Sequence, residues 1–313
     1  MNFERLGYIE RLGLWPARAI WLVAPLTMDP ALSRALQSQA STPGLLVEIW
    51  LWLCWFVVLV AGLTPSPRSL TITRIAGPSA IGATIAAAMA ETWDGRSVLA
   101  IALASLFTAT VFLPTFGDRM VNGSAYGAER RMALRPPAFV LLGPAQLAWL
   151  LVFAGLAAAP LLILAERYLL AGLAAGVGAV AVWAGGRVLH QLARRWIVFV
   201  PAGFVIHDPM ALFDSVLLRR KEVVALGPAL ADSATAGSSS DDPEGPRIDL
   251  SGGALGLALE VGLRATTLIT IRARGQLHNR EVSNIVFSPT LPGAMLSEAR
   301  IRGLKIGEAP VGR

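Results

Sequence analysis

Long apolar runs dominate the first two thirds of the chain. Five of them are long enough, at about 1.5 Å per residue, to approach or exceed the ~30 Å hydrocarbon core of a bilayer. They cover residues 44–63, 75–90, 97–113, 139–165 and 169–189. The pattern therefore predicts an α-helical membrane bundle of about five transmembrane helices within residues 44–194, preceded by an N-terminal tail at residues 1–43.

Two of these runs carry residues with a specific structural meaning. The fourth contains Pro144 and Pro160, which predict a tilt or a kink. The fifth contains Gly172 and Gly176 in a GxxxG pattern, which permits close approach of two helix backbones. This helix-packing motif indicates either a dimer interface, and hence a homo-oligomer, or packing within one bundle. We favour packing within the bundle.

The N-terminal tail has an apolar stretch of its own. Residues 12–27 mix aliphatic and tryptophan side chains with Pro16 and Arg18. This stretch predicts either an amphipathic helix lying in the membrane interface or a helix packed on the transmembrane bundle. Glu4 and Glu10 interrupt the basic start, which is not typical of a signal peptide.

From Trp196 onwards the apolar positions follow the spacing of β-strands. We expect strands at 196–200, 204–207, 215–220, 222–226, 255–263, 268–274 and 285–287. A short helix follows, with Thr290 as its cap, Pro292 in its first turn and Gly303 at its end. Residues 229–247 are rich in Ser, Asp, Gly and Pro, and we expect them to be a disordered insertion.

The order of these elements carries a resemblance to a known family. Residues 195–207 (RWIVFVPAGFVIH) and 215–226 (SVLLRRKEVVAL) resemble the opening strands of bacterial pleckstrin-homology-like (PH-like) domains attached to membrane helices. The resemblance covers residues 195–303 and implies a small PH-like β-domain with a C-terminal helix at 195–313. It also implies a scaffold or binding role. The larger number of spans and the insertion at 229–247 depart from the commoner layout of that family.

Composition and charge agree with a membrane part followed by a soluble part. The chain is 54% hydrophobic and 15% charged, whereas soluble domains carry about 25% charged residues. Residues 1–195 hold 15 Arg and 9 acidic residues, while residues 196–313 hold 12 basic and 12 acidic residues. The positive charge thus surrounds the apolar runs, which argues against nucleic acid as a partner. The preference for Arg over Lys suggests a GC-rich bacterial source.

The distribution of Arg around the runs predicts the orientation. The loops 64–74 and 114–137 and the start of the C-terminal domain would share one side, and their arginines include Arg74, Arg194 and Arg195. The positive-inside rule places that side in the cytoplasm, in the plasma (inner) membrane of a bacterium. The four Arg of the tail conflict with this placement unless residues 12–27 enter the membrane as a further segment.

The chain carries little sign of catalytic chemistry. Cys54 is the only cysteine and the three histidines are scattered, so no disulfide, metal site or cofactor is expected. No nucleotide-binding loop or nucleophile motif is found. The centres of the predicted spans hold no ionisable residue, and Glu48, about one turn inside the first span, is the best candidate for one. The protein is therefore expected not to be an enzyme.

Two functions follow from this pattern. Arg219, Arg220 and Lys221 form the sharpest basic cluster of the C-terminal domain, and Arg272 and Arg274 form a second one. Each could contact anionic lipid or an acidic protein partner, or could be a solvated strand end. The first hypothesis is a non-enzymatic membrane scaffold that binds a protein partner of unknown identity through its PH-like domain. The alternative is a transport or permeation component with a regulatory cytoplasmic domain, because the spans rich in small residues could line a cavity.

Overall fold

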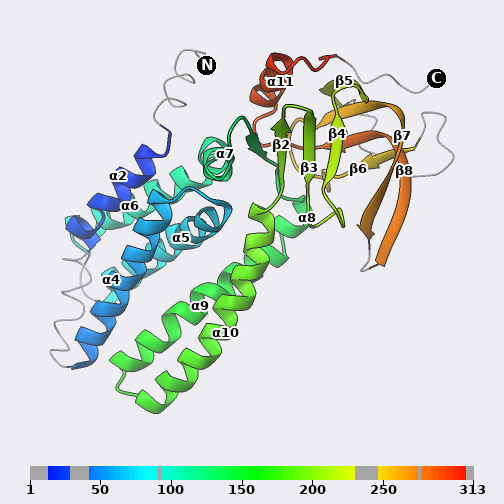
Figure 1. The fold of residues 1–313 in the computed structure, drawn as a ribbon. Helices are drawn as coiled ribbons and strands as arrows, with labels where there is room; N and C mark the ends of the chain where they lie inside the picture. Colours follow the sequence, from blue (N-terminus) through cyan, green and yellow to red (C-terminus); the bar gives the residue numbers. More distant parts are fainter. Residues whose placement is uncertain (1–12, 29–41, 91–92, 230–245, 274–275, 308–313) are drawn as a thin grey trace. The chain divides into compact units, whose positions relative to one another are not determined.

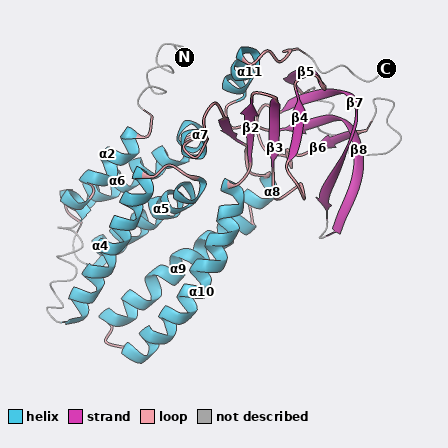
Figure 2. Ribbon diagram, in the orientation of Figure 1, coloured by secondary structure: helices cyan, strands magenta, loops and turns pink. Residues whose placement is uncertain are grey.

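The chain divides into a helical unit and a β unit. The computed structural model describes residues 13–28, 42–90, 93–229, 246–273 and 276–307. The helical unit consists of Met1–Gly123 and Ala145–His190, and the β unit consists of Ser124–Pro144 and Gln191–Arg313. Figures 1 and 2 show the helices of the first unit and the strands of the second.

The helical unit confirms the expected set of long apolar helices. Five helical stretches are long and apolar enough to cross a membrane: Thr42–Leu63, Pro67–Met89, Gly95–Phe112, Ala138–Leu164 and Tyr168–Ala193. The helices of the unit are α2 (Trp15–Val23), α4 (Thr42–Leu63), α5 (Pro67–Ala90), α6 (Gly95–Phe112), α7 (Pro114–Asn122), α9 (Pro144–Leu164) and α10 (Tyr168–Ala193).

Helix α5 begins earlier than the hydropathy pattern predicted. It starts at Pro67, a residue suited to the first turn of a helix, so Arg68 and Arg74 lie inside the helix and not in a loop. The Arg74 Nε atom donates a hydrogen bond to the carbonyl oxygen of Val111, 3.2 Å away near the end of α6, and its guanidinium lies over the ring of Phe112. Arg74 therefore takes part in packing between helices.

The fourth run is interrupted at one of its prolines. The chain forms α8 (Ala138–Leu141), leaves the helix at residues 142–143, and begins α9 at Pro144. Pro144 therefore starts a helix, where its missing N–H costs nothing. Pro160 lies within α9.

Helix α2 packs on the other helices of its unit, which is one of the two alternatives for the tail. Its Trp21 ring lies 4.5 Å from the ring of Phe107 in α6. The indole Nε1 of Trp21 donates to the carbonyl oxygen of Trp55, and the indole Nε1 of Trp55 donates to that of Trp21, both at 3.0 Å. These reciprocal bonds satisfy two polar groups inside an apolar contact.

The same contacts establish the direction of α2. Its Arg18 Nε donates to the carbonyl oxygen of Gly62, one residue before the end of α4, while Trp21 meets Trp55 further back along α4. The two helices are therefore antiparallel, and the start of α2 lies level with the end of α4. The tail thus holds a nine-residue helix that packs antiparallel on α4.

We predict that both ends of the chain lie on one side of the membrane. For helices that cross a bilayer, the start of α2 and the end of α4 share a side, and α5, α6, α9 and α10 return the chain to it. Reporter fusions placed before Met1 and after Arg313 of the full chain should give the same sidedness. Opposite sidedness of the two fusions would contradict the antiparallel arrangement.

Close contact between α9 and α10 depends on small residues. A methyl group on Gly155 would meet the carbonyl oxygen of Gly178 at 2.8 Å, and one on Gly185 would meet that of Ala148 at 2.7 Å. These distances are too short for a Cβ, so the two backbones approach closely only because these positions are glycine.

The β unit contains two four-stranded sheets. The first has the order β1-β2-β3-β4 and the second the order β5-β7-β8-β6, in which β6 is parallel to β8 and the other pairs are antiparallel. The strands are β1 (Arg130–Ala133), β2 (Trp196–Val200), β3 (Gly203–His207), β4 (Val216–Arg219), β5 (Val223–Pro228), β6 (Arg247–Asp249), β7 (Leu259–Ala273) and β8 (Gln276–Phe287).

The first strand of the β unit comes from between two helices of the other unit. Residues 114–137 were expected to be a polar loop, but they form α7 and β1. Strand β1 pairs with β2 from Arg130 opposite Phe199 to Ala133 opposite Trp196. Four residues with two arginines lack the length and alternation that mark a strand in a sequence, and β1 forms because β2 offers it an edge. The β unit therefore includes residues 124–144 besides the C-terminal region expected at 195–313.

The C-terminal helix closes the core of the β unit. Helix α11 (Pro292–Ile301) buries Met295 and Ala299 completely, and Gly303 ends it with φ +74°. Thr290 does not cap it, because its hydroxyl donates to the carbonyl oxygen of Ala133 and so holds β1. The core lies between the sheets and this helix, with Phe199, Phe204 and Phe287 among its fully buried residues.

One strand begins later than its alternation predicted. Residues 255–258 precede β7, which starts at Leu259. Gly252, Gly253 and Gly256 just before it have positive φ and form a turn. Residues 230–245 of the expected insertion lie outside the described part of the chain.

A buried ion pair lies where the chain passes from α10 into the β unit. The side chain of Arg195 is 2% exposed, and its Nε and Nη2 atoms donate to the two carboxylate oxygens of Asp208 at 2.9 and 2.6 Å. Its remaining donors reach the carbonyl oxygens of Arg135 at 2.6 Å and Leu250 at 2.7 Å. The guanidinium that was counted as a membrane-orienting charge is thus an internal link between four segments.

We predict that Asp208→Asn destabilises the β unit. The exchange leaves the buried Arg195 charge without its carboxylate, a change that costs about 3–5 kcal/mol. Hydrogen exchange of the full-length protein should show a marked loss of protection in β2 and β3. The control is Asp214→Asn, an exposed carboxylate in the following loop, which should leave protection nearly unchanged. Equal effects of the two exchanges would contradict the assigned role.

Candidate functional site

The sharpest basic cluster of the sequence lines a shallow hollow of the β unit. The hollow has a volume of about 570 Å³ and is lined by Pro201, Ala202, Arg219, Arg220 and Lys221. These residues come from two turns, the one between β2 and β3 and the one between β4 and β5. The structure therefore places all three residues of this predicted cluster at one site.

Backbone contacts hold the two turns together. The Arg220 amide donates to the carbonyl oxygen of Ala202 and its Nη2 to that of Pro201, both at 2.9 Å. Gly203 allows this approach, because a Cβ there would overlap the carbonyl oxygen of Leu218. The hollow therefore lies between two turns that hydrogen bonds hold together.

Positive charge prevails around the hollow. Glu222 is the carboxylate in the same turn, where it accepts a hydrogen bond from the Arg219 amide at 3.0 Å and lies 3.9 Å from the guanidinium of Arg219. Arg219, Arg220 and Lys221 are all exposed. Exposed cations beside free solvent attract an anionic group without a large desolvation cost.

A fourth cation at this site was not found from the sequence. Arg264 of β7 donates through Nε to the carbonyl oxygen of Lys221 at 2.9 Å, and its amide donates to that of Glu222 at 2.8 Å. The register of β7 shifts between Gly262 and Thr267, and this irregularity places Arg264 at the turn. No signal in the sequence marks the shift. We call Arg219, Arg220, Lys221 and Arg264 the basic end of the β unit.

The basic end lies away from the helix connections. Strand β2 starts at Trp196, three residues after α10 ends, and Trp196 pairs with Ala133, from which the chain continues to α8. The turn at Pro201 follows the other end of the five-residue β2. At about 3.3 Å per residue, roughly 15 Å of strand separates the two ends.

The second predicted cluster does not join the first. Arg272 lies eight residues after Arg264 along β7, and its guanidinium is 5.8 Å from the centre of the Phe213 ring. Arg274 lies outside the described residues. The structure therefore does not place Arg272 at the hollow.

The GxxxG glycines make no close contact within the described chain. A Cβ on Gly172 or Gly176 would have nothing within 4 Å, whereas Gly178 and Gly185 of the same helix meet α9. Packing within the bundle, which we favoured, therefore uses a different pair of glycines. A homo-oligomer contact at Gly172 and Gly176 stays a prediction.

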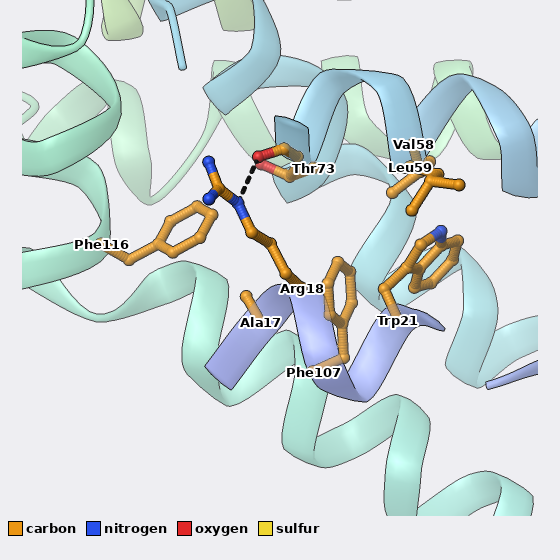
Figure 3. Close-up of a pocket in the computed structure, with 9 residues that line it drawn as sticks. Ala17, Arg18, Trp21, Val58, Leu59, Thr73, Phe107 and Phe116 are labelled. Carbon is orange, nitrogen blue, oxygen red and sulfur yellow. Dashed lines mark hydrogen bonds between the residues drawn. The ribbon is translucent and has the colours of Figure 1, made fainter. Parts of the chain in front are cut away.

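A very small cavity lies between the helices of the helical unit. It is lined by residues of α2, α4, α5, α6 and α7, and Figure 3 shows Arg18 and Trp21 at its wall. Its volume is about 10 Å³, which is at the lower limit for a single water molecule. The small residues Gly77 and Gly82 of α5 pack against Thr108 and Phe153. These two positions therefore serve helix packing.

A serine and a histidine lie together at the helix-connection end of the β unit. The Nδ1 atom of His207 is 2.8 Å from the Ser215 hydroxyl, and its ring stacks on Trp196 with centroids 4.7 Å apart. Asp208, the neighbouring carboxylate, is bound by Arg195. Burial lowers the pKa of His207 below its usual 6.5, helped by the positive charges of Arg194 and Arg131 and opposed by Asp208. The hydrogen bond links the end of β3 to the residue just before β4.

We predict that His207 makes folding less favourable in acid. Its pKa is lower in the folded protein than in the unfolded chain, so the unfolded chain takes up the proton first as the pH falls through about 6.5. The melting temperature of the purified protein should therefore drop between about pH 7.5 and pH 5.5, and the drop should be smaller in His207→Asn. Equal drops in both proteins would show that His207 does not contribute.

Comparisons of the chain with protein-family models, with characterised proteins and with solved structures find no match. Among the residues that the structure describes, no group of three or more His, Cys, Asp or Glu side chains is placed to hold a metal ion. We therefore take the basic end as the candidate functional site, because the geometry places four cations together there.

Proposed function

We propose that this protein is a non-enzymatic membrane scaffold. In this proposal the apolar helices anchor the β unit, and the basic end of that unit binds an acidic segment of a protein partner. Five helices that are long and apolar enough to cross a membrane support the anchoring part. The hollow, lined by three cations with Arg264 bonded to the same turn, supports the binding part.

The β unit is proposed to be a variant of the PH-like fold. Two four-stranded sheets followed by a helix that covers the core agree with the order of elements on which the resemblance rested. Strand β1, which comes from between two helices, and the parallel strand β6 are departures from that order. The unit would then be a binding module that the helices interrupt.

The observation that carries the proposal is the position of the basic end. It lies at the end of β2 opposite the connections to α8 and α10. A cluster that recognised lipids of the same membrane would be expected beside those connections, because the attraction to anionic lipid falls off within about a Debye length of ~10 Å. We therefore favour a protein partner over phospholipid.

We propose that the β unit lies on the cytoplasmic side of the membrane. Arg68 at the start of α5 and Arg119 in α7 lie on the same predicted side as the β unit. The antiparallel packing of α2 on α4 brings the start of α2 to that side as well. The positive-inside rule then favours a cytoplasmic β unit in a bacterial inner membrane.

A transport component stays the alternative proposal. It rested on small residues that could line a cavity. Of these, Gly77, Gly82, Gly178 and Gly185 are engaged in helix contacts, whereas Gly172 and Gly176 have nothing within 4 Å. The cavity beside Arg18 and Trp21 is too small for a solute. Solute flux through liposomes that contain the purified protein would support this alternative.

We predict that a partner crosslinks at the basic end in a charge-dependent manner. A photo-crosslinking residue at Pro201 in the full-length protein should give a distinct protein adduct in native membranes. Lys221→Glu should reduce that adduct several-fold, because one reversed charge at a close ionic contact removes an attraction and adds a repulsion. The matched control is Arg280→Glu, an exposed arginine on β8, which should leave the adduct unchanged.

Other outcomes of this experiment decide against the proposal. Equal loss in both variants would indicate a general charge effect. A lipid adduct in place of a protein adduct would show that the basic end binds phospholipid.

A further inference from the structure

Several large apolar side chains are exposed at the end of the β unit that carries the helix connections. Three from its loops and strands are Phe213, Leu255 and Leu277, which are 51%, 84% and 51% exposed. Single exposed apolar residues are ordinary, but several from separate segments at one end indicate a contact surface. We call these three residues the junction surface.

Leu255 is tied to the start of a candidate span. The Arg135 Nη1 atom donates to the carbonyl oxygen of Leu255 at 2.6 Å, and the Ala138 amide donates to that of Gly252 at 3.3 Å. Ala138 is the first residue of the candidate span Ala138–Leu164. Within the β unit itself, the loop of Leu255 therefore lies beside residues that would enter the membrane.

Phe213 and Leu277 reach the same end through the ribbon of β7 and β8. The Phe213 amide donates to the carbonyl oxygen of Thr270 at 3.0 Å, and the Arg272 guanidinium lies over the Phe213 ring. Arg272 is opposite Leu277 in the register of the two strands. Figure 2 shows this two-stranded ribbon extending beyond the rest of its sheet.

The Arg195 side chain brings these segments to one place. It binds the carbonyl oxygens of Arg135 and Leu250 and the carboxylate of Asp208. Arg135 precedes the candidate span. Leu250 lies five residues before Leu255, and Asp208 lies five residues before Phe213. Arg195 itself follows α10 by two residues. The junction surface and both helix connections thus share one end of the β unit.

We propose that the junction surface rests in the interfacial layer of the bilayer that the chain's own helices cross, an inference that depends on the membrane placement proposed above. We propose lipid as the occupant because the loop of Leu255 lies next to the first residue of the candidate span. Arg272 fits the same place, because a guanidinium over an aromatic ring can reach headgroup phosphates while the ring and the leucines meet the acyl boundary.

This contact has a consequence for the basic end. A β unit that touches the bilayer at Phe213, Leu255 and Leu277 is restrained beyond its covalent connections. The hollow at the opposite end of β2 then faces away from that membrane surface. The junction surface would in this way leave the basic end accessible to a soluble partner.

The test measures the surroundings of single labelled positions in the full-length protein. With Cys54→Ser as background, the variants Phe213→Cys, Leu255→Cys and Leu277→Cys are each labelled with an environment-sensitive fluorophore. The proteins are placed in nanodiscs of phosphatidylcholine and phosphatidylglycerol, which leave both faces open. Lys221→Cys at the basic end is the aqueous control, and Leu173→Cys, an exposed position of α10, is the membrane control.

We expect shallow spin-labelled lipid to reduce the emission at the three junction positions about twofold or more, as for side chains ~5–10 Å deep in the interface. Aqueous iodide should have little effect there. Lys221→Cys should show the reverse. The inference is overturned if the junction positions respond to iodide as Lys221→Cys does, or if neither quencher reaches them, which would indicate a covering protein surface or a second copy. Lack of lipid quenching at Leu173→Cys would instead overturn the membrane placement itself.

Discussion

The ion pair of Arg195 and Asp208 is the interaction on which the arrangement of the β unit depends. A buried guanidinium is tolerated only when a carboxylate and hydrogen-bond acceptors surround it. Here the acceptors are the two oxygens of Asp208 and the carbonyl oxygens of Arg135 and Leu250. Because Arg195 and its acceptors belong to four separate segments, satisfying one charge brings together the end of α10, the approach to α8, the end of β3 and the loop before β7.

A second constraint follows from the interrupted path of the chain. Strand β1 lies between α7 and α8 in sequence but pairs with β2, and Thr290 holds it from the other side. The first sheet is therefore complete only when a segment from the middle of the chain has joined the C-terminal region. The β unit cannot be treated as an appended domain that begins at residue 195, since removing residues 124–144 would expose the edge of β2. Residues 130–133, which lie between α7 and α8 in the chain, are thereby an integral part of the first sheet.

Much of the architecture could be predicted because its signals are local. Runs of about twenty apolar residues predict five long helices, and the change to alternating apolar positions after Trp196 predicts strands. Errors occurred where a distant partner decides the structure. Strand β1 and the position of Arg264 depend on neighbours far away in the chain, and Arg74, which was expected in a loop, bonds to the carbonyl oxygen of Val111 in α6. The glycines that permit the contact of α9 with α10 are Gly155 and Gly178, while the GxxxG motif itself has no neighbour in the described chain.

By itself, the sequence determined the membrane-type character of the helices, the presence of a β-rich region and the basic cluster at Arg219, Arg220 and Lys221. These properties depend on hydropathy, periodicity and charge, which residues close together in the sequence determine. Only the tertiary structure decided that Arg195 is an internal ion-pair partner, that α2 runs antiparallel to α4, and that the basic end lies opposite the helix connections. Each of these depends on which groups far apart in the chain satisfy one another's hydrogen bonds, and composition and periodicity do not specify that pairing.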